Sequence, residues 1–321
     1  MHVAIASSLV RPEAIAHLKQ IGGDKATVVD TEPALVEALK TVDGLVCSDN
    51  AYTPAVAEAV RRAPNLRWMQ LLNAGYDNTG RLGIPDGLIL CNVGDAFSPS
   101  VAVHAVGLLM ALQRGVPALI ARQREHKWDR AVTNHMTMPS GGTLLIVGYG
   151  SIGREIARLM APLGMRVVGV SRSGRDDPKA PGPRADEMHK ISDLASLLPR
   201  ADAVVLSLPL GPTTTGLIGA KELALCKRTA LLINISRGLV VDTPALVAAL
   251  HAGTIGGAGL DVTEPEPLPA DQPLWDAPNL IISPHIAGAA GPDGVARLSD
   301  RAGANLQRYL AGEPVQHVVT M

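Results

Sequence analysis

The sequence predicts an α/β protein built from two doubly wound parallel sheets. Short apolar runs alternate along the chain with segments whose apolar residues recur at helical spacing. Such alternation is typical of parallel sheets that are covered by helices on both faces. A glycine-rich turn lies between one apolar run and one helical pattern, and 321 residues are enough for two domains.

The first hundred residues contain the strands expected for the first sheet. These strands are at 3–6, 26–29, 44–47, 66–71 and 88–92, and helical patterns lie between them at 12–21, 33–40 and 54–62. Ligands of such sheets bind at the carboxyl ends of the strands. The loop after the fourth strand, with Asn73, Ala74 and Gly75, is therefore a candidate for ligand contact. The alternative is a simple turn without ligand contact, and the loop sequence taken alone favours this alternative.

A long apolar helix is expected next. Ser98, Pro99 and Ser100 resemble a helix start, with Ser100 as the N-cap. Residues 101–125 then form one helical pattern that is apolar over much of its circumference at first. Such a helix is buried, so we expect it between the domains or against a second subunit.

Six strands are expected in the second sheet. They are at 143–147, 166–170, 203–208, 230–235, 257–261 and 280–283, with helical patterns at 194–198, 220–226 and 244–251. Six strands make a complete doubly wound dinucleotide-binding sheet. Segment 176–184 is rich in Pro, Gly and charge, which indicates an exposed loop. A last helix at 290–312 is long enough to return to the first domain.

The glycine turn has the spacing of a dinucleotide-binding motif. It consists of Gly148, Tyr149, Gly150, Ser151, Ile152 and Gly153. In such a motif the first glycine permits a tight turn, the second admits a pyrophosphate, and the third lets helix and strand pack closely. The helix N-terminus then offers N–H groups to the phosphates. We expect a dinucleotide here, and an ordinary glycine turn is the alternative.

The end of the next strand indicates which dinucleotide binds. An NAD site usually has a carboxylate about 20 residues after the glycines, where it accepts a hydrogen bond from the ribose 2′-OH. Here the segment offers hydroxyl and guanidinium groups instead, from Ser171, Arg172, Ser173 and Arg175. Arginine binds phosphate in bidentate fashion, so we predict NADP(H), with NAD(H) possible. A solvated basic turn is the alternative.

Composition excludes several classes of partner. The 29 Lys and Arg residues are balanced by 30 Asp and Glu residues, so nucleic acid is not expected. The apolar run at 101–112 is too short to span a bilayer, and the N-terminus lacks signal-peptide features. Cys47, Cys91 and Cys226 have no zinc or disulfide spacing. We expect a cytoplasmic protein that binds neither a metal nor a membrane.

Three charged residues each follow the end of an expected strand: Arg237, Glu266 and His285. Arginine binds a carboxylate or polarises a carbonyl, and histidine donates a proton near neutral pH. A neighbouring carboxylate favours the imidazolium and holds the ring. Each residue alone is more often a surface charge. Together, beside a dinucleotide, they predict hydride transfer to a 2-keto acid.

The chain resembles the D-isomer-specific 2-hydroxyacid dehydrogenases over nearly its whole length. The resemblance rests on the segments 147–154, 206–210, 233–238, 259–267 and 283–286. It implies that Arg237 binds substrate, that His285 is the acid/base, and that Glu266 rather than Glu264 is the partner of His285. It further implies a substrate loop at Asn73, Ala74 and Gly75, and cofactor contacts from Leu208, Pro209, Thr214, Ile235, Asp261 and His285, with Asp261 on the nicotinamide carboxamide.

The same resemblance implies the domain layout. A flavodoxin-like substrate domain comprises residues 1–100 plus 288–321, and a Rossmann cofactor domain, 101–287, is inserted in it. A homodimer joined through the cofactor domain is expected. Two positions depart from the family pattern: Val103 replaces a frequent glutamate, and Gly211 replaces a frequent threonine.

The predicted activity is NADPH-dependent reduction of a small 2-keto acid, of the glyoxylate or hydroxypyruvate type, to the D-2-hydroxy acid. An NAD-dependent D-2-hydroxyacid dehydrogenase of the phosphoglycerate type is one alternative. A non-catalytic regulator that senses a dinucleotide is the other.

Overall fold

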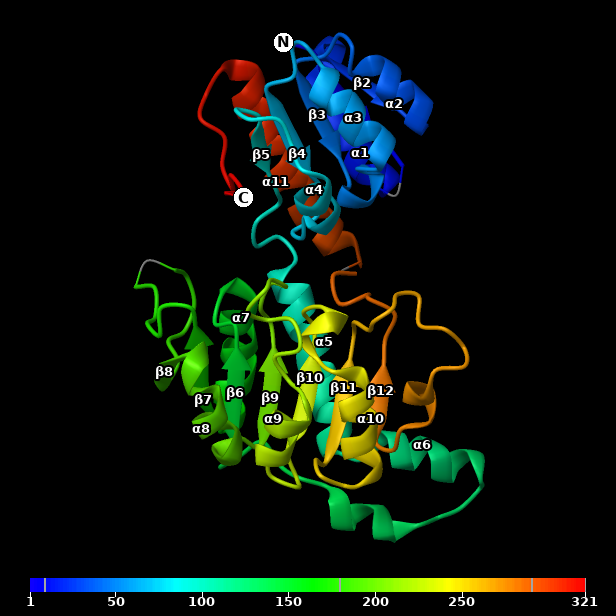
Figure 1. Cartoon of the computed structure of the whole chain (residues 1–321), viewed down its shortest axis with the longest axis vertical. Coiled ribbons are helices and arrows are strands. Elements are labelled where there is room, and N and C mark those ends of the chain that lie inside the picture. The colour runs from blue at the N-terminus through cyan, green and yellow to red at the C-terminus, as the bar shows by residue number, and fades with distance from the viewer. Residues whose placement is uncertain (9, 179, 290, 321) are drawn as a thin grey trace. The chain divides into compact units, whose positions relative to one another are not determined.

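A computed structural model describes residues 1–8, 10–178, 180–289 and 291–320. The chain folds into two compact units, Met1–Phe97 with Ala290–Met321, and Ser98–Ala289 (Figure 1). The units begin and end close to the boundaries expected at residues 100 and 288. Each unit is a parallel sheet with helices, which confirms the predicted α/β class. The assignment of substrate to the first unit and of dinucleotide to the second stays a prediction.

The first unit has a five-stranded parallel sheet over its described residues, in the order β2-β1-β3-β4-β5. This is the flavodoxin-like order. The strands are β1 (Val3–Ala6), β2 (Ala26–Val29), β3 (Gly44–Cys47), β4 (Trp68–Leu71) and β5 (Ile89–Cys91). The helices are α1 (Pro12–Gly22), α2 (Glu32–Ala38), α3 (Pro54–Arg62), α4 (Asp77–Leu82) and α11 (Gly291–Ala311), with 3-10 helices η1 (Gly23–Lys25) and η2 (Asp49–Ala51). Helix α4 was not predicted, and β4 and β5 are shorter than expected.

A hydrophobic layer lies on each face of this first sheet. Leu35 of α2 and Val56 of α3 belong to one layer, and Leu18 of α1 belongs to the other together with Trp68. Trp68 is fully buried and stacks on Tyr309 of α11, with 4.6 Å between the ring centroids. This stack holds the last helix of the chain on the N-terminal sheet, and truncating such a residue to alanine costs about 3–5 kcal/mol.

The second unit has a seven-stranded parallel sheet over its described residues, in the order β12-β11-β10-β9-β6-β7-β8. Its strands are β6 (Thr143–Val147), β7 (Arg166–Ser171), β8 (Glu187–Lys190), β9 (Ala203–Leu206), β10 (Leu231–Asn234), β11 (Gly257–Leu260) and β12 (Leu280–Ile282). Its helices are α5 (Ser98–Gln113), α6 (Val116–Arg124), α7 (Ser151–Met160), α8 (Leu194–Leu197), α9 (Ala220–Leu225) and α10 (Thr243–His251). Its 3-10 helices are η3 (Arg130–His135), η4 (Ala161–Leu163), η5 (Ile191–Asp193), η6 (Leu198–Arg200), η7 (Gly238–Val240) and η8 (Pro273–Asp276).

The prediction of six strands for this sheet was wrong, because it missed β8. This strand pairs with β7 at the edge of the sheet and is the third strand along the chain in this unit. Its residues are Glu187, Met188, His189 and Lys190, which form no apolar run, and none of them is fully buried. Segment 176–184, expected as an exposed loop, connects β7 to β8, and Asp176 in it is largely buried. Residue 179 lies outside the described part of the chain.

The prediction of a single long helix at 101–125 was also wrong. The chain forms α5 and α6, which are bent by 63° relative to each other. Gly115 between them has φ 64°, a left-handed conformation that glycine adopts without strain. Helix α5 begins at Ser98, so Ser100 lies inside the helix and is not its N-cap. Helix α5 packs against α7, β10 and β11, so much of its apolar surface is buried within its own unit.

Among the described residues, we find no individual helix with the length and apolarity needed to cross a membrane; α5 and α6 pass that test only as a bent pair.

Candidate active site

The glycine turn lies where the order of the second sheet reverses, after β6 and between β7 and β9. Gly148 has φ 103°, and a Cβ atom there would lie 2.4 Å from the carbonyl oxygen of Ser207. A Cβ atom on Gly153 would lie 2.7 Å from the carbonyl oxygen of Gly148. The fold itself therefore requires glycine at these two positions.

Gly150 is different, because an added Cβ atom would find no other atom within 4 Å. It is the N-cap of α7, and the first N–H groups of a helix have no partner within the helix. The turn therefore leaves open space in front of the N–H groups of Ser151 and Ile152, which donate no hydrogen bond to any described residue and lie at the positive end of a helix dipole. This arrangement fits a pyrophosphate group.

A cavity of about 450 Å³ opens beside the glycine turn. Of the residues predicted to bind a cofactor, the following line it: Gly148, Tyr149, Gly150, Ser171, Arg172, Leu208, Pro209 and Thr214. None of its described lining residues is Asp or Glu, whereas Arg172 contributes a positive charge. The cavity therefore suits an anionic ligand.

The turn after β7 is closed by its own hydroxyl groups. Ser171 and Ser173 donate hydrogen bonds to the carbonyl oxygen of Arg175, at 3.0 and 3.3 Å. The backbone N–H of Arg175 donates to the hydroxyl of Ser173 at 3.2 Å. Arg172 and Arg175 are both exposed, but only Arg172 lines the cavity. The turn thus places one guanidinium group, that of Arg172, at the predicted dinucleotide site.

The three predicted catalytic residues lie at the carboxyl ends of adjacent strands, β10, β11 and β12. His285 Nδ1 is 2.8 Å from Glu266 Oε2, and Glu266 Oε1 accepts a hydrogen bond from the N–H of Thr263 at 3.0 Å. The backbone of Thr263 lies against Gly238, where a Cβ atom would be 2.0 Å from the Thr263 carbonyl oxygen. Gly238 follows Arg237 directly. The structure therefore brings Arg237, Glu266 and His285 to one edge of the sheet.

The imidazole of His285 is half exposed, and the carboxylate of Glu266 is partly exposed. Solvent screens such a pair, which is then worth about 0–1 kcal/mol to stability. The main effect of the pair is that Glu266 orients the imidazole ring of His285. When Nδ1–H donates to Glu266, Nε2 is the nitrogen left to carry a proton, and among the described residues it has no hydrogen-bond partner.

Asp261 holds the loop that carries His285. Its buried carboxylate accepts hydrogen bonds from the hydroxyl of Ser283 at 2.7 Å and from the N–H groups of Ile286 and Ala287, each at 2.9 Å. His104 Nε2 is 3.3 Å from the same carboxylate. The backbone carbonyl of Asp261 accepts from the N–H of His285 at 2.7 Å. These contacts hold His285 at φ 53°, which is unusual for a residue other than glycine.

Several predicted cofactor residues also serve the fold in the described structure. Ile235 and Leu208 are buried at the ends of β10 and β9. The hydroxyl of Thr214 donates to the carbonyl oxygen of Pro209 at 2.9 Å and so closes the turn after β9. Gly211 in that turn has room for a side chain, because a Cβ atom would meet only Thr214 Oγ1, at 4.0 Å. Val103 is 60% exposed on α5.

The predicted substrate loop belongs to the first unit, where other side chains hold it. Asn73 Oδ1 accepts a hydrogen bond from the N–H of Asp49 at 2.7 Å, so this amide supports the loop. Asn92 Nδ2 donates to the carbonyl oxygen of Ala74 at 2.8 Å. The N–H groups of Ala74 and Gly75 donate no hydrogen bond to any described residue. They are therefore available to an anion.

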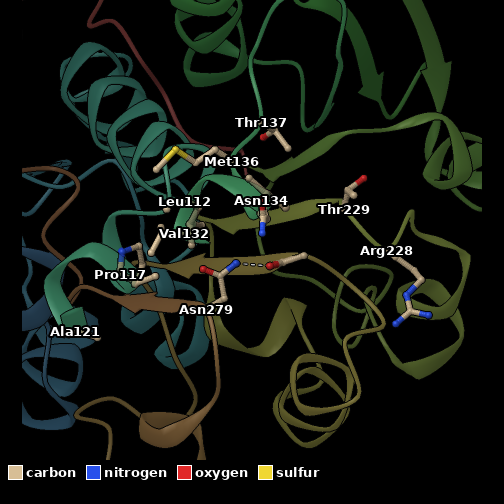
Figure 2. A pocket seen from close by; sticks show the side chains of 14 residues that line it. Leu112, Pro117, Ala121, Val132, Asn134, Met136, Thr137, Arg228, Thr229 and Asn279 are labelled. Atoms are coloured by element: carbon tan, nitrogen blue, oxygen red, sulfur yellow. Dashed lines mark hydrogen bonds between the residues drawn. The ribbon is translucent and has the colours of Figure 1, made fainter. Parts of the chain in front are cut away.

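A second cavity, of about 590 Å³, lies at the amino ends of β10, β11 and β12 (Figure 2). Its walls come from α6, from the segment around Val132 and Met136, and from Thr229 and Asn279 just before β10 and β12. Asn279 donates a hydrogen bond to the carbonyl oxygen of Gly256. Arg228 is the one charged residue among its described lining residues, so the cavity has no acid–base pair.

Several residues at the carboxyl edge of the second sheet were not predicted from the sequence. The hydroxyl of Ser207 donates a hydrogen bond to the carbonyl oxygen of Gly148 at 2.8 Å. Leu210, Pro212 and Thr213 line the cavity beside the glycine turn. These residues directly follow β9, so the rule that ligands bind at carboxyl ends could have identified them. His104 could not be identified this way, because it reaches Asp261 from a helix far away in the sequence.

The chain is similar to known proteins over most of its length. The profile of the family described as D-isomer specific 2-hydroxyacid dehydrogenase, NAD binding domain, matches residues 106–287. The glyoxylate reductase of Korarchaeum cryptofilum is 36% identical over 288 residues, which are 88% of this chain and 84% of that protein. The D-3-phosphoglycerate dehydrogenase of Methanocaldococcus jannaschii is 32% identical over 312 residues, which are 96% of this chain but only 57% of that longer protein.

A solved structure agrees with these relatives. The D-isomer specific 2-hydroxyacid dehydrogenase family protein of Aeromonas salmonicida subsp. salmonicida A449 superimposes with a TM-score of 0.83 at 31% identity, over 99% of both chains. The resemblance inferred from the sequence motifs is confirmed. The chain belongs to the D-isomer specific 2-hydroxyacid dehydrogenases, an oxidoreductase family that uses a nicotinamide dinucleotide, and it carries their NAD-binding domain.

Proposed function

We propose that this protein is an NADPH-dependent reductase that converts a small 2-keto acid, of the glyoxylate or hydroxypyruvate type, to the D-2-hydroxy acid. One observation carries the proposal. The His285–Glu266 pair lies with Arg237 at the same sheet edge that holds the open glycine turn. This edge thus combines a proton donor, a cation and a site for a dinucleotide.

Each residue has a distinct task in this reaction. When bound, the reduced nicotinamide supplies the hydride that is added to C2. Arg237 binds the carboxylate and polarises the carbonyl through its charged N–H groups. His285 delivers the proton from Nε2 to the carbonyl oxygen, and Glu266 holds the ring through Nδ1. The N–H groups of Ala74 and Gly75 bind the substrate carboxylate.

The preference for NADPH rests on charge. Arg172 lines the cavity beside the glycine turn, and no Asp or Glu is among the described lining residues. A carboxylate there would select NADH, because it would bind the 2′-OH and repel a 2′-phosphate. Asp261 is proposed to contact the nicotinamide carboxamide in addition to holding the His285 loop.

We also propose a homodimer joined through the second unit. Leu119 and Ile120 of α6 and Trp128 after it are exposed, Trp128 by 97%, which is unusual for large apolar side chains. Helix α6 also forms one wall of the second cavity (Figure 2). A second copy of the chain packed against α6 would bury both the exposed apolar side chains and the second cavity. A cytoplasmic location is proposed because Cys47, Cys91 and Cys226 are free thiols.

The experiment is a panel of 2-keto acids assayed with both cofactors, in which the loss of NADPH or NADH absorbance is followed. We expect the highest kcat/KM with NADPH and glyoxylate or hydroxypyruvate, and the D product by chiral chromatography. Faster turnover of phosphohydroxypyruvate with NADH would replace the proposal with the phosphoglycerate-type activity. Tight NADPH binding without turnover of any 2-keto acid would support a dinucleotide-sensing regulator instead.

A further inference from the structure

Arg154 directly follows the last glycine of the turn and is only 3% exposed. Its guanidinium forms an ion pair with Asp176. It also donates hydrogen bonds to the carbonyl oxygens of Asp177, at 3.2 Å, and Pro183, at 3.3 Å. All three acceptors belong to one segment, 176–183, which follows the turn at 171–175. One buried cation therefore joins the start of α7 to the segment that continues the predicted 2′-phosphate turn.

Tyr149 adds a second link between the same two regions. Its hydroxyl donates to the carbonyl oxygen of Pro183 at 3.1 Å, and its ring centroid is 5.2 Å from Arg154 Cζ. Burial raises the pKa of Tyr149 to about 12, so the hydroxyl keeps its proton at any physiological pH. The side chain of Tyr149 thus supports Arg154, while its backbone belongs to the glycine turn.

The ion pair between Arg154 and Asp176 places a carboxylate close to the predicted 2′-phosphate turn. Asp176 directly follows Arg175, and its Oδ2 atom is buried without a hydrogen-bond partner among the described residues. Arg154 supplies the ion pair that neutralises this carboxylate. An unneutralised carboxylate beside the turn would repel a 2′-phosphate, whereas an uncharged 2′-hydroxyl would not be repelled.

We propose that Arg154 is a positioning residue for nucleotide selectivity. It neutralises Asp176 and holds segment 176–183, so that the turn at 171–175 can receive a 2′-phosphate. This inference rests on the proposed use of NADPH. Arg154 acts without touching the nucleotide, because its guanidinium is turned to Asp176 and to two backbone carbonyls.

The test measures binding of 2′,5′-ADP and ADP to the full chain by calorimetry, so that no turnover is needed. Arg154→Gln is expected to weaken 2′,5′-ADP about tenfold, the size of a lost charge-assisted interaction, and ADP less than about twofold. Arg158→Gln is the matched control. Arg158 lies on the same helix and is 54% exposed, and among the described residues it pairs only with Glu155 one turn away, so its loss should change neither affinity.

A rescue separates this role from a merely structural one. Adding Asp176→Asn to Arg154→Gln removes the uncompensated carboxylate, so 2′,5′-ADP affinity should recover in part. Equal losses for both nucleotides in Arg154→Gln, or no recovery in the double variant, would overturn the inference. If Arg154→Gln does not fold, Arg154→Lys takes its place, because lysine keeps the positive charge but cannot make the forked hydrogen bonds. The affinity of Arg154→Lys for 2′,5′-ADP should fall by less than that of Arg154→Gln, and its affinity for ADP should not change.

The wild type separates this inference from the proposed function. If the unmodified protein binds ADP as tightly as 2′,5′-ADP, the NADPH preference itself is wrong. If the unmodified protein prefers 2′,5′-ADP and Arg154→Gln keeps that preference, only the role of Arg154 is wrong.

Discussion

The two halves of the seven-stranded sheet place different sets of charged groups at the same carboxyl edge. Around β6, β7 and β9, the cavity has Arg172 and no Asp or Glu among its described lining residues. Around β10, β11 and β12, carboxylates are present together with positive or donor groups: Glu266 contacts His285, and Asp261 accepts hydrogen bonds from the loop that follows β12. One sheet edge can thus bind an anion at one end and move a proton at the other.

Two histidine–glutamate pairs of this unit have similar geometry but different surroundings. His189 Nε2 is 2.9 Å from Glu187 Oε2, and His285 Nδ1 is 2.8 Å from Glu266 Oε2. Glu187 also pairs with Arg166 and Arg200, which makes it part of a surface charge network. Glu266 instead uses its second oxygen for the backbone of Thr263. Distance alone does not distinguish the two pairs, and their surroundings give them different roles.

The largest expected effect comes from His285→Ala. The kcat for 2-keto acid reduction should fall about 10³-fold, the typical effect of losing a general acid. The dissociation constant for NADPH should change less than about twofold, because the phosphate half of the edge is intact. Steady-state kinetics and fluorescence titration measure the two quantities. His189→Ala, which breaks the other pair, is the control, and equal losses in both variants would contradict the assignment.

Arg172→Asp should reverse the charge of the anion-binding half. The dissociation constant for NADPH should rise about 100-fold, since a bidentate cation is replaced by a repelling carboxylate, while that for NADH rises less than about threefold. Titration with each cofactor measures the change. Arg166→Gln, at the opposite end of β7, should leave both values as they are. Loss of both cofactors to the same degree would refute the assignment of the 2′-phosphate site.

Gly150→Ala separates binding from folding within the glycine turn. A methyl group at Gly150 meets no protein atom but occupies the space in front of helix α7. Cofactor affinity should therefore fall about tenfold with an unchanged unfolding temperature. Gly148→Ala should instead lower the unfolding temperature, because Gly148 has φ 103° and lies against Ser207. The two melting curves check this contrast, and it fails if Gly150→Ala unfolds as early as Gly148→Ala.

The smallest expected effect concerns Glu187. Hydrogen bonds from Arg200 and His189 lower the pKa of this carboxyl from 4.5 to about 2 in the folded protein. A lowered pKa contributes stability above pH 4.5, and this contribution is lost as the pH falls toward 2. Glu187→Gln should therefore reduce the denaturation midpoint slightly at pH 7 and progressively less below pH 4.5. A difference that stays constant down to pH 3 would contradict the role of this charge network.

Much of the proposed site could be predicted because its signals are local. Arg237, Glu266 and His285 each follow a recognisable strand, and parallel strands bring their carboxyl ends to one edge. Strand β8 had no such signal, since an edge strand with polar residues gives no apolar run. The helix break was missed because Gly115 is a single residue within an apolar pattern.

Three features of the protein follow from local sequence: the alternation of strands and helices, the glycine spacing and the residue types at the strand ends. These features depend on backbone geometry and on hydrophobic period over a few residues. The contacts of Arg154 and Asp261 with distant polar groups depend on the packed fold. Arg154 and Asp176 are 22 residues apart, and Asp261 receives Ser283 and His104 from two further elements. Such contacts depend on how distant segments pack, because a charged side chain is buried only where folding brings it a partner.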